Sequence, residues 1–97
     1  MPYKRHDLKC AREPFGAVVR GLKKWEFRRD DRGFEVGHDV FLHELIHAPG
    51  ASRGSASPGV PSGRYVEARI IYLLRGPEFG IPEGFAVFSI EILNVHV

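Results

Sequence analysis

Hydrophobic and polar positions alternate along several short segments of the chain, which is the pattern of half-buried β-strands. We predict strands at residues 6–10, 23–29, 40–42, 64–74 and 85–97. After the first strand the hydrophobic spacing changes to i, i+3, i+4 and i+7, which predicts a short helix from Pro14 to Gly21. This order of elements favours an α+β fold, namely a small, largely antiparallel β-barrel of about five strands with one or two short helices.

The alternation is sharpest between residues 23 and 29. Trp25 and Phe27 point to one face of this strand, and we expect both rings in the core rather than stacked on a nucleic-acid base. The opposite, charged face consists of Lys24, Glu26 and Arg28. The strand at 64–74 alternates in the same way, and its apolar side is expected to hold Val66, Ala68, Ile70, Tyr72 and Leu74.

Composition interrupts this pattern at residues 48–63, where glycine, serine and proline dominate. Such a segment cannot bury enough apolar surface to become ordered, so we expect a flexible loop inside a single domain that spans residues 1–97. No hydrophobic run approaches the roughly 20 residues needed to cross a bilayer, and the N-terminus lacks the apolar segment of a signal peptide. We therefore expect a cytoplasmic protein without a membrane partner.

The charge is unevenly distributed, although the net value is only +2. Residues 1–37 hold ten Lys and Arg against six Asp and Glu, whereas residues 38–97 hold four against six. Ten of the basic residues are arginines, whose planar guanidinium suits phosphates and base edges. The basic part of the chain therefore fits a surface that faces nucleic acid, but a solvated surface with internal ion pairs fits it too. Charge alone favours the solvated surface, because +2 is small for a nucleic-acid-binding protein.

His43, Glu44 and His47 form an H-E-x-x-H sequence, which on a helix would present two zinc ligands and a general base. Turn signals on both sides leave about nine residues, too few for a stable zinc-binding helix. In a strand the two histidines would be about 13 Å apart, too far to share one zinc ion. No third ligand is evident, so we predict no metal site and no cofactor.

A longer pattern covers much of the chain. It consists of His6-Asp7-Leu8-Lys9, then Gly21, then Lys23, Glu26 and Arg28, then Asp31-Arg32-Gly33-Phe34-Glu35-Val36-Gly37. This pattern resembles the ASCH branch of the PUA-like superfamily, in particular a small uncharacterised family within it. An inserted His38 separates Gly37 from Asp39, which are adjacent in that family. The resemblance covers nearly the whole chain except residues 48–63.

The resemblance implies a β-barrel whose cleft is lined by the helix end and by the strand at 23–29. It also implies work on RNA, since superfamily members bind RNA and some ASCH proteins cut RNA or hydrolyse a modified cytidine. The expected function is therefore binding of RNA or of a nucleotide-like ligand in a basic cleft. The expected binding residues are Lys9, Lys23, Glu26, Arg28, Asp31 and Arg32.

Two alternatives belong to other functional classes. The first is an RNA hydrolase or a modified-nucleoside amidohydrolase, in which Lys23 and Glu26 would form an acid–base pair in the same cleft. In the amidohydrolase relatives, a threonine nucleophile stands where this chain has Glu26. The second alternative is an accessory module whose partner is another protein.

The residues also fit plainer roles. The charged strand face fits a surface ladder of ion pairs, each contributing at most about 1 kcal/mol. Asp31 and Arg32 fit a pair that stabilises a turn. Cys10, the single cysteine, fits a small core residue or an inert thiol. With the family pattern added, a binding cleft is favoured over the ladder.

Overall fold

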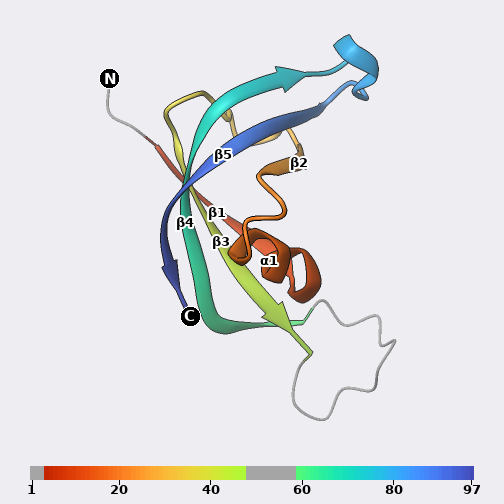
Figure 1. Cartoon of the computed structure of the whole chain (residues 1–97). Coiled ribbons are helices and arrows are strands. Elements are labelled where there is room, and N and C mark those ends of the chain that lie inside the picture. Colours follow the sequence, from red (N-terminus) through yellow and green to blue (C-terminus); the bar gives the residue numbers. More distant parts are fainter. Residues whose placement is uncertain (1–3, 48–58) are drawn as a thin grey trace.

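The computed structural model describes residues 4–47 and 59–97, which form a curled sheet with one α-helix (Figure 1). The elements in chain order are β1 (Arg5–Ala11), α1 (Arg12–Val19), β2 (Trp25–Arg29), β3 (Asp39–Ile46), β4 (Val60–Arg75), the 3-10 helix η1 (Glu78–Gly80) and β5 (Phe85–His96). The predicted order of strands and helix is confirmed, as is a small, barrel-like α+β architecture.

The sheet is open between its two edge strands. Its strand order is β1-β3-β4-β5-β2, with β1 and β3 parallel and the other neighbours antiparallel. No pairing among the described strands joins β1 to β2, so the sheet curls into a half-barrel rather than a closed barrel. Two arginines bridge the gap: Arg28 Nη2 donates to the carbonyl of Lys9 at 2.9 Å, and Arg32 Nη1 donates to that of Asp7 at 2.6 Å. These side chains donate hydrogen bonds to carbonyls of β1 that would otherwise need a donor from another strand or from water.

Helix α1 packs against β1 and β3 through the buried side chains of Phe15 and Val18. Pro14 lies in its first turn, where the missing N–H has no partner to lose. Gly21 follows the helix with a φ of 75°, a conformation that glycine adopts without strain. The helix begins and ends two residues earlier than predicted, at Arg12 rather than Pro14 and at Val19 rather than Gly21.

Within residues 4–47 and 59–97, no helix is long and apolar enough to cross a membrane.

The hydrophobic core lies on the concave side of the half-barrel. Alternate residues of β1, β3, β4 and β5 point into it, as the two-residue period of a strand requires. Its buried members are Leu8, Cys10, Phe15, Val18, Phe34, Val40, Leu42, Val66, Ala68, Ile70, Phe88 and Ile90.

Strand β2 turns the opposite face inward from the one we expected. Glu26 is 2% exposed, whereas Trp25 and Phe27 are 50% and 46% exposed, so the prediction that both rings lie in the core is wrong. The register explains the reversal, because Glu26 is paired with the core residue Phe88 and Phe27 is paired with Val87 on the outer face. Alternation shows that a strand has two faces, but the pairing with β5 decides which of them is buried.

Strand β4 is longer than predicted. It begins at Val60 rather than at Arg64, so residues 60–63 belong to the strand and not to a flexible loop. The rest of the expected loop, residues 48–58, lies outside the described residues.

A β-bulge between Ile70 and Tyr72 reverses the faces of β4 beyond that point. Tyr72 therefore points outward and is 62% exposed, and Leu73 packs against the core in its place. The expectation that Tyr72 and Leu74 share the side of Ile70 is wrong. A bulge depends on the partner strand, so the alternation of β4 alone does not reveal it.

Candidate functional site

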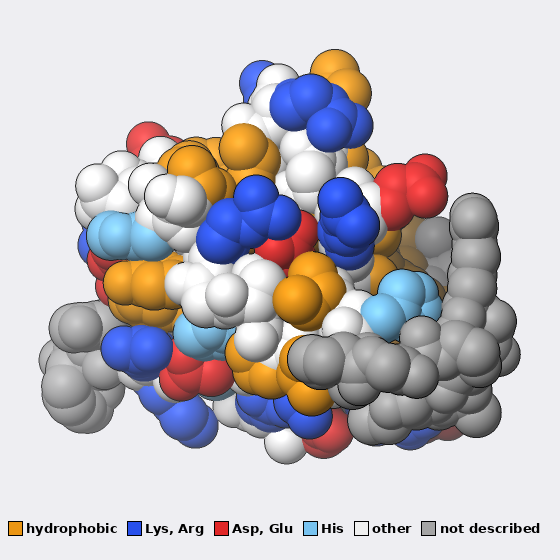
Figure 2. Space-filling view, turned by 90° about the horizontal axis from the view of Figure 1, so that it is seen from below, with side chains coloured by type: hydrophobic (Ala, Val, Ile, Leu, Met, Phe, Trp, Pro, Cys, Tyr) orange, Lys and Arg blue, Asp and Glu red, His pale blue; other side chains and the backbone are white. Residues whose placement is uncertain are grey.

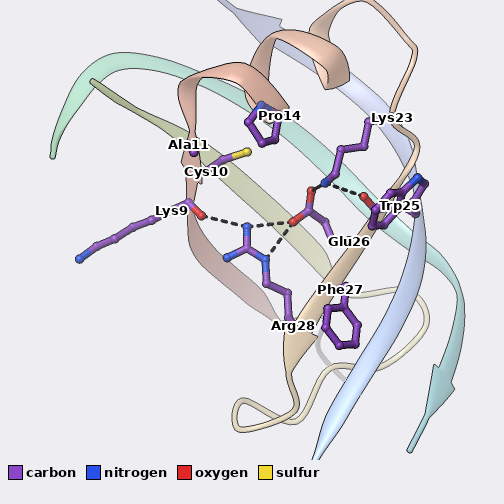
Figure 3. A pocket seen from close by; sticks show the side chains of 9 residues that line it. All are labelled: Lys9, Cys10, Ala11, Pro14, Lys23, Trp25, Glu26, Phe27 and Arg28. Atoms are coloured by element: carbon purple, nitrogen blue, oxygen red, sulfur yellow. Dashed lines mark hydrogen bonds and ion pairs between the residues drawn. The ribbon is translucent and has the colours of Figure 1, made fainter. Parts of the chain in front are cut away.

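A cleft of about 220 Å³ lies between β1 and β2, the two edge strands of the half-barrel (Figure 3). One wall is formed by the end of β1 and the start of α1. The other is formed by β2 and by Lys23, which lies just before that strand. The cleft is lined by Lys9, Cys10, Ala11, Pro14, Lys23, Trp25, Glu26, Phe27 and Arg28.

The Glu26 carboxylate lies at the centre of a charge cluster in this cleft. Its Oε2 accepts a hydrogen bond from Lys23 Nζ at 2.5 Å, and its Oε1 accepts one from Arg28 Nε at 2.9 Å. Two cations thus surround one carboxylate, and the cluster as a whole carries one positive charge. Figure 2 shows a grouping of this kind, with an acidic side chain between basic ones, near the middle of the face seen from below.

The backbone holds both cations in place. Lys23 Nζ also donates to the carbonyl of Trp25 at 2.9 Å and lies 4.7 Å from the centre of the Trp25 ring. Glu26 and Arg28 are two residues apart, so both point to the inner side of β2. Arg28 then reaches across the gap to the carbonyl of Lys9. Such preorganisation reduces the entropy that a ligand would lose when it orders these side chains.

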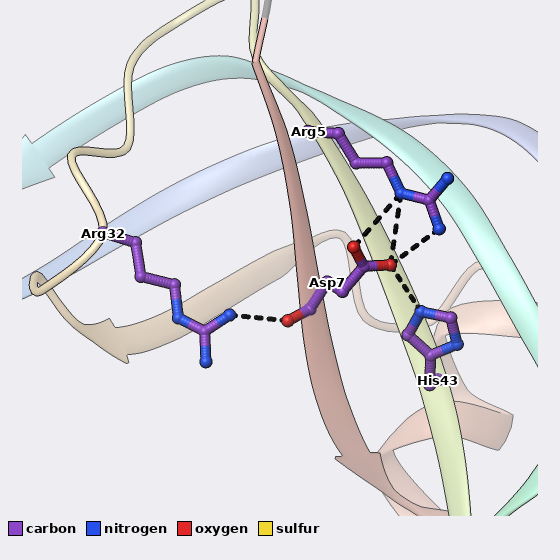
Figure 4. Close-up of polar contacts among 4 residues, drawn as sticks. All are labelled: Arg5, Asp7, Arg32 and His43. Atoms are coloured by element: carbon purple, nitrogen blue, oxygen red, sulfur yellow. Dashed lines mark hydrogen bonds and ion pairs between the residues drawn. The ribbon is translucent and has the colours of Figure 1, made fainter.

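The other three predicted site residues lie outside this cluster. Lys9 contributes its carbonyl to the cleft, but its side chain points away from it (Figure 3). Arg32 donates to the carbonyl of Asp7, which lies two residues before Lys9 on β1 (Figure 4). Arg32 therefore contacts the same edge of β1 as Arg28 does, but at the preceding outward-facing residue. Asp31 is exposed and lies 3.8 Å from Arg32, as a pair that stabilises a turn would.

Cys10 lines the cleft but is buried, with 4% of its surface exposed. Burial raises the pKa of its thiol, and the nearby Glu26 carboxylate raises it further. A thiol with a raised pKa is a poor nucleophile at neutral pH, so the geometry agrees with the inert thiol expected from the sequence.

A second buried carboxylate, Glu44, belongs to the H-E-x-x-H sequence. Arg64 donates to it from Nε and from Nη2, both at 2.8 Å. Burial alone would raise the pKa of Glu44, but hydrogen bonds from Ser62 and Arg64 outweigh it, and the pKa is lowered. The sequence carries no signal for this pair, because 20 residues separate Glu44 from Arg64.

The two histidines of the same sequence are not one helical turn apart. The motif lies on strand β3 and not on a helix, as expected, with His43 on the strand and His47 just after it. His43 Nε2 is 2.8 Å from Oδ1 of Asp7, whose pKa is lowered by its hydrogen bonds with Arg5 and His43 (Figure 4). The described residues contain no group of three or more His, Cys, Asp or Glu placed to hold a metal ion. That the motif binds no zinc stays a prediction.

A pair formed by the buried His6 and the half-buried His38 was not anticipated from the sequence. His6 is 3% exposed, packs against the ring of Phe34, and has its Nε2 3.0 Å from Nδ1 of His38. Burial lowers the pKa of His6, and the charges of His38 and Lys4 lower it further. The signal available was His38 itself, the residue inserted into the family pattern.

An open half-barrel with a cleft between its edge strands defines a small, barrel-like α+β protein. The chain belongs to the family described as "Domain of unknown function (DUF3850)", whose profile matches residues 5–90 and so includes the whole cleft. It is also 39% identical over 70 residues to the "Uncharacterized 12.9 kDa protein in GpA 3'region" of Escherichia phage P2. That match covers 72% of this chain and 54% of the phage protein, so the chain spans about half the length of this curated relative. The resemblance to the ASCH branch stays a prediction.

Proposed function

We propose that the cleft between β1 and β2 binds RNA or a nucleotide-like ligand through its phosphate. The observation that carries the proposal is the charge of the Glu26 cluster, in which Lys23 and Arg28 together exceed the single carboxylate by one positive charge. Both cations are partly exposed in the cleft, whereas Glu26 is buried beneath them. A phosphate would therefore meet the cations first, and Arg28 would offer it the part of the guanidinium that Glu26 and the Lys9 carbonyl do not hold.

The aromatic rings beside the cations favour a nucleotide over a simple anion. Trp25 and Phe27 line the cleft and are about half exposed. Lys23 lies over the Trp25 ring and Phe85 stacks on the Phe27 ring, so a base would use the exposed remainder of each ring. Stacking of a base on an aromatic side chain contributes about 1–3 kcal/mol and needs no particular sequence. The PUA-like character implied by the sequence pattern supports the same class of ligand and forms part of this proposal.

Binding is favoured over hydrolysis by the surroundings of Glu26. Each of its oxygens already accepts a hydrogen bond from a cation, and the residue is 2% exposed. A general base has to lie within hydrogen-bond reach of the proton that it removes, so a substrate would have to displace Lys23 or Arg28 first. An RNA hydrolase or nucleoside amidohydrolase with Lys23 and Glu26 as its acid–base pair is thus the second candidate.

Trp25 is the single tryptophan of the chain, so its fluorescence reports directly on the cleft. At low salt we expect saturable quenching by an oligouridylate. Arg28→Ala should weaken this binding about tenfold to a hundredfold, as the loss of a charge-assisted hydrogen bond does. Arg28→Lys keeps the charge but loses the planar guanidinium, so its affinity should lie between those of the wild type and of Arg28→Ala.

The matched control is Arg5→Ala, which removes the same charge from the outer face of β1. Its affinity should equal that of the wild type, and circular dichroism should show that all variants are folded. Absence of saturable quenching would overturn the proposal, as would an equal loss of affinity in Arg5→Ala and Arg28→Ala. Absence of nucleic-acid binding would favour the accessory module that binds a protein.

A further inference from the structure

The outer face of β2, β5 and β4 is formed mainly by aromatic and aliphatic side chains. The hydrogen-bonded register arranges them in rows across the three strands, with Ser89 between Trp25 and Tyr72, and Val87 between Phe27 and Leu74. Arg29 and Phe85 form the next row. We call this surface the aromatic face; its apolar members are Trp25, Phe27, Tyr72, Leu74, Phe85 and Val87.

The aromatic face is continuous with the cleft. Trp25 and Phe27 belong to both, since they line the cleft and also head two of the rows. The rings of Phe27 and Phe85 are stacked, with their centres 5.2 Å apart. A ligand that leaves the cleft past Trp25 therefore meets further aromatic surface without a break.

Basic groups border the aromatic face at both ends. The Lys23 ammonium lies over the Trp25 ring on the cleft side, and the Arg29 guanidinium lies 5.0 Å from the centre of the Phe85 ring at the other side. None of the three rows contains an acidic side chain. Rings that bases can stack on, bordered by cations that can neutralise phosphates, match the chemistry of single-stranded nucleic acid.

We propose that the aromatic face binds the bases of a single-stranded nucleic acid whose backbone is held in the cleft. This inference rests on the proposed function and deepens it, because it names a strand of several nucleotides as the ligand rather than a mononucleotide. Adjacent strands lie about 4.8 Å apart, so Trp25 and Tyr72 are separated by roughly 10 Å across β5. That distance corresponds to about three nucleotides at roughly 3.4 Å each in a stacked strand. A duplex does not fit this surface, because its bases are already stacked on one another.

The length of the ligand provides the first test. Uridine monophosphate, hexauridylate and hexadeoxyuridylate are titrated into the full chain, with Trp25 fluorescence as the readout. We expect the hexamers to bind at least tenfold more tightly than the monophosphate. Equal affinity of the two hexamers would show that the ribose hydroxyl is not read, whereas preference for hexauridylate would make RNA the ligand.

Tyr72 separates this inference from the proposed function, because it lies on the aromatic face and not in the cleft. Tyr72→Ala should weaken hexamer binding between about fivefold and a hundredfold, the range expected for one lost stacking partner, and should leave monophosphate binding unchanged. Tyr72→Leu, which keeps an apolar side chain, should behave in the same way. Phe79→Ala is the control, since Phe79 is an exposed ring in η1, outside the three rows.

Each other outcome contradicts a defined part of the account. If hexamers bind no more tightly than the monophosphate, or if the Tyr72 variants bind as the wild type does, the inference is overturned while Arg28-dependent binding still supports the proposed function. If neither ligand binds, the proposed function fails and the inference fails with it. If the wild type forms a dimer in sedimentation that Tyr72→Ala dissociates without changing affinity, the aromatic face is an interface between copies and the inference is overturned.

Discussion

The two most deeply buried carboxylates of the described residues are Glu26 on β2 and Glu44 on β3, each 2% exposed. Their ion-pair partners differ in number. Within the described residues, Glu44 forms its ion pairs with Arg64, so one guanidinium matches one carboxylate. Glu26 is paired with both Lys23 and Arg28. The first pair is balanced, whereas the second cluster keeps a positive charge beside a cleft.

The difference separates a structural pair from a candidate binding site. A balanced pair avoids the large free-energy penalty of an unpaired buried charge and leaves no charge for a ligand. An unbalanced cluster at a cleft attracts anions from solution. The H-E-x-x-H sequence, whose Glu44 is in the balanced pair, is the more conspicuous motif, but it is the plainer segment around Glu26 that lines the cleft.

The largest effect is expected from Arg64→Ala, which leaves the Glu44 carboxylate buried without its partner. The free energy of unfolding at neutral pH should fall by about 3 kcal/mol, the lower end of the range for a broken buried pair, because Arg64 itself is half exposed. Urea denaturation measures this loss. Affinity for hexauridylate should not change. A loss well below 1 kcal/mol, or weaker binding by the folded variant, would remove the distinction between the two carboxylates.

A smaller effect is expected from Glu26→Gln, because the two cations that it releases are partly exposed to water. Stability should fall by about 1–2 kcal/mol. Affinity for hexauridylate should stay equal or increase, since a negative charge near the phosphates is removed. An enzyme would instead lose turnover of RNA while the complex still forms, which a parallel assay of RNA breakdown detects. A large loss of affinity would show that Glu26 itself contacts the ligand.

The histidine pair extends the comparison to a contact between a buried imidazole and a half-buried one. Because burial lowers the pKa of folded His6 below its ordinary value of 6.5, the unfolded chain takes up this proton at a higher pH than the folded one. The stability that His6 contributes is therefore complete above about pH 6.5 and declines as the pH falls through the window below it.

Urea denaturation at pH 7.5 and 5.5 tests this sign. The wild type should lose stability at the lower pH, and His6→Asn, which cannot titrate, should lose less. Asp7 provides an internal contrast, because its lowered pKa affects stability only below its ordinary value of 3.8. Equal pH dependence in both proteins would contradict the role assigned to the pair.

Local patterns predicted the elements of this fold well. The spacing of Phe15 and Val18 identified the helix, and alternation identified the strands in the correct order. The strand at 23–29 also placed Lys23, Glu26 and Arg28 in one site, because residues two apart share a face and the preceding lysine is close by. Local patterns therefore predicted which residues lie together in the Glu26 cluster.

Long-range pairing decided the rest. Glu26 faces inward because of its register with β5, a contact that residues 23–29 do not encode by themselves. The bridge from Arg28 to the carbonyl of Lys9 joins the two ends of the sheet order, and the pair of Glu44 with Arg64 joins β3 to β4. The net charge of each cluster follows from such contacts, so local patterns did not show that two cations share the Glu26 carboxylate or that one guanidinium matches Glu44.

The salt dependence of binding shows whether the surplus charge of the Glu26 cluster holds a phosphate. Hexauridylate affinity is measured from about 50 to 200 mM salt for the wild type, Arg28→Ala and Arg5→Ala. On a double-logarithmic plot, each phosphate contact to a single strand contributes a slope of about 0.7. The account predicts that Arg28→Ala flattens the slope by about that amount and that Arg5→Ala leaves it unchanged. A wild-type slope in Arg28→Ala would show that the charge beside Glu26 does not meet a phosphate.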